Sequence, residues 1–124
     1  LISHFDNEFR FKFRVNVMEH QELLVGLIRL HILHHAAEQE IYGQWMLDEL
    51  AEHGYRLSAG TLYPMLHGLE RRGYLVSREE HEGSKRRKFY RATKKGIEGL
   101  AVAKVQLREL AGEAIEQSTP KGKQ

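Results

Sequence analysis

The chain has 124 residues, a formal net charge of +2, 41% hydrophobic residues and no cysteine. This length and composition fit one folded domain with a modest core, and they exclude a disordered tail, disulfides, thiolate metal ligands and Cys nucleophiles. No apolar run approaches the roughly 20 residues needed to cross a bilayer, so we expect a cytoplasmic protein without a membrane partner.

Residues 1–18 form an N-terminal extension. Its apolar residues alternate with polar ones in the period-two pattern of a strand: Phe9, Phe11, Phe13, Val15 and Val17. Five exposed apolar side chains would favour aggregation, so we expect this arm to pack on the body or on a partner chain. Two alternatives stay open, namely a basic arm that reaches DNA and a true start at Met18.

Two helices are predicted next. Residues 19–38 carry apolar side chains over more than one stripe, which indicates a helix buried on more than one side, against its own core and a partner chain. Residues 42–53 place Trp45, Met46 and Leu50 on one face, and Gly54 is suited to end this second helix.

A third helix follows Ser58, a good N-cap, and ends at Gly73. Together with the second helix it forms a predicted helix-turn-helix, in which the first turn of the later helix faces the major groove. We therefore predict DNA contacts from residues on this helix: Ser58, Gly60, Thr61, Tyr63, His67 and Arg71. Tyr63 has a second interpretation as a core residue, and Pro64 is interpreted as structural.

A hairpin with strands YLVSRE and RRKFYRA comes next. Residues 71–95 contain ten Lys or Arg and three Glu, a net charge of +7 in a chain of +2, so the remainder carries −5. A basic hairpin beside a helix on an acidic body is typical of a nucleic-acid binder. We predict phosphate contacts from the basic strand: Lys85, Arg86, Arg87, Lys88 and Arg91. The alternative is an ordinary solvated hairpin.

The last helix, predicted for residues 94–117 after the cap Thr93, repeats apolar residues at spacings of three and four, as in a coiled-coil seam. We predict that it forms a dimer with help from the first long helix, through Leu23, Leu27, Leu30, Leu100, Leu107 and Leu110. Residues 118–124 are predicted to be a flexible tail. The expected fold is mainly α with a small β-hairpin (α+β): a winged helix-turn-helix over residues 19–93, with a C-terminal dimerisation helix.

Histidines and carboxylates do not predict a catalytic or metal centre. His31, His34 and His35 lie at i, i+3 and i+4, but neither a carboxylate nor a Cys completes an obvious ligand set. We interpret them as surface and interface histidines. The sequence has no HExxH, GxSxG, P-loop or GxGxxG motif. We expect no enzyme activity, no metal and no cofactor.

Three segments, YGQWMLDEL, GTLYPMLHGLERRGYL and GSKRRKFYRATKKG, resemble the motif blocks of PadR-type transcriptional regulators over residues 27–96. The resemblance implies a homodimeric DNA-binding repressor, and the single helix after the wing is similar to the shorter members, one of which modifies the cyanobacterial circadian clock. Gly68 and Ala92 depart from the family pattern. Some short members hold aromatic drugs through a Trp in the last helix, whereas the only Trp here is Trp45.

The functional prediction is a repressor that binds double-stranded DNA as a homodimer, at a pseudo-palindromic operator with half-sites about one helical turn apart. Two alternatives are kept. One is a winged-helix adaptor that contacts proteins instead of DNA, and the other is a ligand-responsive regulator with its effector in the dimer cavity.

Overall fold

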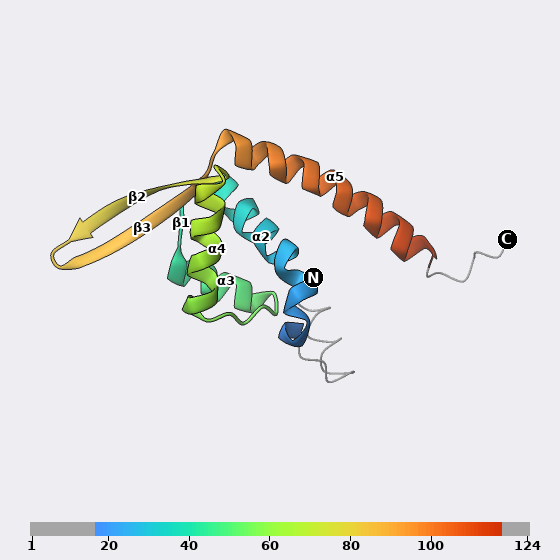
Figure 1. Ribbon diagram of the computed structural model, residues 1–124, viewed down its shortest axis with the longest axis horizontal. Helices are drawn as coiled ribbons and strands as arrows, with labels where there is room; N and C mark the ends of the chain where they lie inside the picture. Colours follow the sequence, from blue (N-terminus) through green and yellow to red (C-terminus); the bar gives the residue numbers. More distant parts are fainter. Residues whose placement is uncertain (1–16, 118–124) are drawn as a thin grey trace.

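The structure, a computed structural model, describes residues 17–117. A short 3-10 turn, η1 (Val17–His20), leads into α2 (Gln21–Glu38), β1 (Ile41–Tyr42), α3 (Gly43–Glu52), α4 (Ala59–Arg71), β2 (Leu75–Glu82), β3 (Lys85–Ala92) and α5 (Lys94–Gln117) (Figure 1). This order of elements confirms the predicted winged helix. The predicted strand in the N-terminal arm and the predicted tail lie outside the described residues, apart from Val17, which belongs to η1. None of the described helices is long and apolar enough to cross a membrane.

The hairpin belongs to a three-stranded antiparallel sheet of order β1-β3-β2, in which β1 was not predicted. Ile41 pairs with Tyr90 and Tyr42 with Phe89. A strand of two residues is too short to show period-two alternation, which explains why the sequence pattern missed it. The hairpin itself runs in register from Leu75 opposite Ala92 to its turn at residues 83–84.

Side-chain caps begin α4 and α5, as the sequence predicted. The Ser58 Oγ accepts the Thr61 N–H at 3.2 Å and closes the first turn of α4. Thr93 does the same for α5, where its Oγ1 accepts the Gly96 N–H at 3.0 Å. Gly73 ends α4 with a φ of 88°, a left-handed conformation that glycine adopts without strain.

The core lies between α2, α3, α4 and one face of the sheet. Its most deeply buried side chains, each with at most 1% exposure, come from all of these elements: Ile28, Ile32, Ile41, Met46, Leu50, Leu62, Leu66 and Tyr90. Each large apolar side chain contributes about 1.5–3 kcal/mol when fully buried. Helix-turn-helix and wing base therefore share one core, and that core fixes the orientation of α4 relative to the hairpin.

Helix α5 leaves this core soon after it begins. Figure 1 shows α5 extending away from the body on the side opposite the hairpin. Leu100 is only 6% exposed and packs in the core of its own domain. Little of its side chain is therefore left for the predicted dimer seam. Farther along the helix the apolar side chains are 38–63% exposed: Val102, Val105, Leu107, Leu110 and Ile115.

Candidate nucleic-acid interface

The N-terminal turn of α4 presents small and polar groups to solvent. Ser58 and Gly60 are exposed, whereas Thr61 is partly buried. The Ser58 hydroxyl donates to the Thr61 Oγ1 at 3.3 Å in addition to capping the helix. In Figure 1 this end of α4 lies away from the hairpin, whose base adjoins the other end of the helix. The turn is therefore free to approach another molecule closely.

Tyr63 is neither fully buried nor fully exposed, so both interpretations of its role stay open. Its side chain is 37% exposed, yet its ring covers Gly43 so closely that a Cβ at that glycine would overlap the ring. The His67 ring lies 6.5 Å from the Tyr63 ring on the same exposed side of α4. Tyr63 therefore joins α4 to the start of α3 and still presents an edge to solvent.

The basic side chains of the wing divide between the two faces of the hairpin, because successive strand residues point in opposite directions. Arg86 and Lys88 share a face with Tyr90, which is buried against the core. Lys85 and Arg87 point to the other face.

On the face that meets α4, Glu70 organises the polar contacts. It accepts a hydrogen bond from the Ser77 hydroxyl at 2.7 Å, and its second oxygen lies 3.9 Å from the Lys88 Nζ. Lys88, one of the predicted phosphate contacts, is partly buried and also lies over the Tyr90 ring. Burial, with a smaller effect of Glu70, raises the pKa of Tyr90 to about 12, so its hydroxyl stays protonated.

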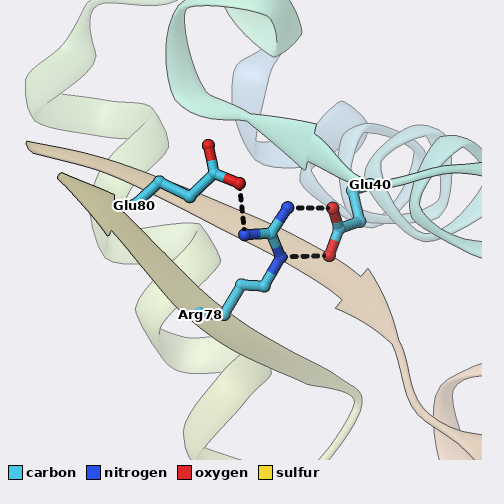
Figure 2. Close-up of polar contacts among 3 residues, drawn as sticks. All are labelled: Glu40, Arg78 and Glu80. Atoms are coloured by element: carbon cyan, nitrogen blue, oxygen red, sulfur yellow. Dashed lines mark hydrogen bonds and ion pairs between the residues drawn. The ribbon is translucent and has the colours of Figure 1, made fainter. Parts of the chain in front are cut away.

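On the opposite face, Arg78 is held between two carboxylates (Figure 2). Its Nε and Nη2 donate to the two oxygens of Glu40 at 2.7 Å, and its Nη1 donates to Glu80 at 2.7 Å. The hydrogen bonds from Arg78 lower the pKa of Glu40. The guanidinium also lies 4.8 Å from the centre of the Phe89 ring. Arg78 thus ties the wing to the start of β1, and its charge is already neutralised within the protein.

Three cations near the hairpin turn, Lys85, Arg86 and Arg87, are called the tip cations below. All three are exposed, and no carboxylate of residues 17–117 forms an ion pair with them. Arg87 lies 4.5 Å from the centre of the Tyr42 ring, which supports its stem without neutralising its charge. Arg71 and Arg91 are also exposed. The tip cations form the most concentrated positive site on the wing.

The predicted dimer residues on α2 border an apolar groove of about 490 Å³. Leu23, Leu27 and Leu30 line it from α2, with Tyr74 and Gly99 on its other sides. Leu23 is 80% exposed at the end of this groove. The groove reaches α5 at Gly99, near the start of that helix.

The three histidines considered in the sequence have different surroundings, because His34 faces solvent whereas His31 and His35 face the segment around α3. His34 lies at the surface with its Nε2 3.6 Å from Glu38. His31 and His35 contact α3, where the His35 ring meets the Trp45 ring edge-on at 5.4 Å. Burial, and then the neighbouring His53, lower the pKa of His31 to about 4. Burial also lowers the pKa of His35, against the opposing effect of Glu49.

Comparisons with known proteins agree with this geometry. The Transcriptional regulator PadR-like family matches residues 32–102. The transcriptional regulator Rv3488 of Mycobacterium tuberculosis is 50% identical over 95 residues, which cover 77% of this chain and 89% of the relative. A PadR family transcriptional regulator from Eggerthella lenta superposes with a TM-score of 0.74 at 30% identity, covering 90% of this chain and 98% of its own. A Streptococcus transcriptional regulator gives a TM-score of 0.69 at 26% identity, with coverage of 78% and 97%.

Proposed function

The chain belongs to the PadR-like family of transcriptional regulators, and from that premise we propose that it is a sequence-specific, homodimeric repressor that binds double-stranded DNA. Membership in this family agrees with the expectation that the protein is not an enzyme. The circadian role implied by one short relative stays a prediction.

The proposed DNA contacts come from two elements, the wing and α4. The tip cations neutralise phosphates, which supplies salt-dependent affinity and sets the register of the protein on the duplex. The first turns of α4 enter the major groove, where Gly60 allows close approach and Thr61 and Tyr63 reach base edges. The observation that carries this proposal is the group of unpaired tip cations on a wing where two of the other cations, Arg78 and Lys88, are already paired.

The proposed dimer uses the exposed part of α5 and the groove on α2. Leu107 and Leu110 would pack against a second copy, because residues 17–117 of one copy leave both side chains exposed. A two-fold axis between the copies would present two α4 helices to the DNA in opposite orientations. The expected operator is therefore pseudo-palindromic.

The test first selects bound fragments of genomic DNA with the purified protein, and then compares variants on a selected fragment. Replacing the three tip cations with Ala should weaken binding and flatten the slope of log K against log salt by up to about 0.9 for each phosphate that is no longer neutralised. Arg86→Ala and Lys88→Ala form a matched pair on one face of β3, and the unpaired Arg86 should contribute more to the slope.

Unchanged affinity of the triple variant at moderate salt would remove the wing from the interface. If deletion of this protein lowers the expression of the gene next to the selected DNA fragment, the protein is an activator instead of a repressor.

A further inference from the structure

A cluster of ionisable side chains lies where α2 packs against the C-terminal end of α3. His31 and His35 are four residues apart on α2, and Glu49 and His53 have the same spacing at the end of α3. Residues at this spacing share one face of a helix. Helix α2 and the C-terminal end of α3, with its cap residue His53, thus bring three imidazoles and one carboxylate together.

The distances within the cluster are short. One ring nitrogen of each of His31, His35 and His53 lies within 4.8 Å of the others. Glu49 bridges two of these rings, with its Oε2 3.4 Å from the His35 Nε2 and 3.3 Å from the His53 Nε2. The His31 and His53 rings are 4.8 Å apart between centroids.

A structural role alone does not account for the polar atoms of this cluster. The Nδ1 of His53 is buried and has no hydrogen-bond partner among residues 17–117. Burying a polar atom without a hydrogen-bond partner destabilises the folded protein, so such atoms are rare in native structures. The other nitrogen of the same ring meets Glu49, as in metal sites where a carboxylate orients a ligating histidine and leaves its second nitrogen for the ion.

We propose that His31, His35 and His53 bind a divalent transition metal ion of the zinc type, with Glu49 as the residue that orients the two imidazoles it contacts. Imidazole nitrogens suit zinc, nickel and copper better than magnesium or calcium. Nitrogens at about 2.0–2.1 Å from a tetrahedral ion are about 3.3–3.4 Å apart, so a nitrogen spacing of at most 4.8 Å closes with small side-chain movements.

A second group of potential ligands shares His35 but is less suitable. His34, His35 and Glu38 also bring their ligand atoms within 4.8 Å of one another. The side chains of His34 and Glu38 are 42% and 63% exposed and lie on a single helix. The three-imidazole site instead joins two helices and contains the unpartnered nitrogen. His34 therefore supplies the control that separates the two sites.

The experiment uses tag-free full-length protein that has been stripped of metal with a chelator, and titrates Zn²⁺ by calorimetry. The wild-type protein should bind one ion per chain. His31→Ala and His53→Ala should each weaken binding on the order of 100-fold or more, because each removes a ligand, whereas Glu49→Gln should cost about 10–100-fold, as expected for an orienting carboxylate. His34→Ala should bind as the wild type does.

Two further measurements keep the result interpretable. Zn²⁺ should raise the melting temperature of the wild type and of His34→Ala but not of His53→Gln. The His53 side chain is 25% exposed, so this position should tolerate glutamine without unfolding. If His31→Ala fails to fold, the His53→Gln titration decides the matter. Absence of binding by the wild type at micromolar Zn²⁺, or binding abolished in His34→Ala and kept in His53→Gln, would overturn the proposal.

Discussion

Acid should destabilise this protein through His31, and the effect can be isolated with one substitution. The pKa of His31 is about 4 in the folded protein and near its usual 6.5 in the unfolded chain. Between these values the unfolded chain binds the proton and the folded protein does not, so stability falls as the pH drops from about 6.5 toward 4. His31→Gln removes the proton site and keeps a polar side chain of similar size.

The size of the effect follows from the same two pKa values. For a ring that is fully withdrawn from water, the loss between pH 7 and pH 5 would be about 2 kcal/mol. The His31 ring is only partly buried, and solvent screening reduces the expected loss to about 1 kcal/mol. Urea unfolding of the wild type and of His31→Gln at pH 7 and pH 5, with a chelator present, gives the free energy of unfolding of each. The loss of stability between the two pH values should be larger in the wild type by this amount.

His81→Gln is the matched control for replacing an imidazole with an amide, because His81 lies on the wing with its side chain 61% exposed. Equal pH dependence in the wild type and His31→Gln would show that His31 is not held neutral by its surroundings. The reasoning about its burial would then be wrong.

Three other predictions test the dimer, the helix and the turn before the wing. Leu107→Asp should give monomers by sedimentation at micromolar protein, because an unpaired charge in an interface costs several kcal/mol, whereas the neighbouring Gln106→Asp should remain dimeric. A wild-type monomer would refute the two-fold assembly. Thr61→Ala should reduce specific DNA binding more than non-specific binding, and Tyr63→Ala should in addition lower the melting temperature. Equal losses of specific and non-specific binding would mean that these residues contact only phosphates. Gly73→Ala should destabilise the fold by about 1–2 kcal/mol in urea titrations, since its φ is 88°, and an unchanged midpoint would contradict that strain.

Much of the fold could be predicted because its signals are local. Ser58 and Thr93 are caps whose partners lie three residues away, and Gly73 marks a helix end through its own backbone. The hairpin strands were predicted from their composition, although both proved longer by one to three residues at an end. The strand that was missed, β1, has only two residues, and its pairing with β3 joins positions nearly fifty residues apart in the chain.

The candidate site was predicted less completely, because tertiary contacts decide which of its charged side chains are already paired within the protein. All the wing cations looked equivalent in the sequence, yet Glu40 and Glu70 neutralise two of them from other elements. One local signal was available: Lys88 lies two residues before Tyr90 and four before Ala92, so strand alternation already placed it on the inward face. The histidine cluster had no such signal, since Glu49 and His53 lie on a different helix from His31.

Thr93 connects the base of the wing to the last helix. Its backbone N–H donates to the Tyr74 carbonyl, and its hydroxyl donates to the Gly73 carbonyl at 2.6 Å. The same hydroxyl oxygen accepts the Gly96 N–H in the first turn of α5. The base of the wing and the long helix therefore turn together as one lever. A helix of 24 residues is about 36 Å long, so a rotation of this whole unit by roughly 10° about its wing end moves the far end of α5 by about 6 Å. In a pair of such chains, a small change in how the long helices cross would alter the distance between the two wings and leave every contact within each wing unchanged.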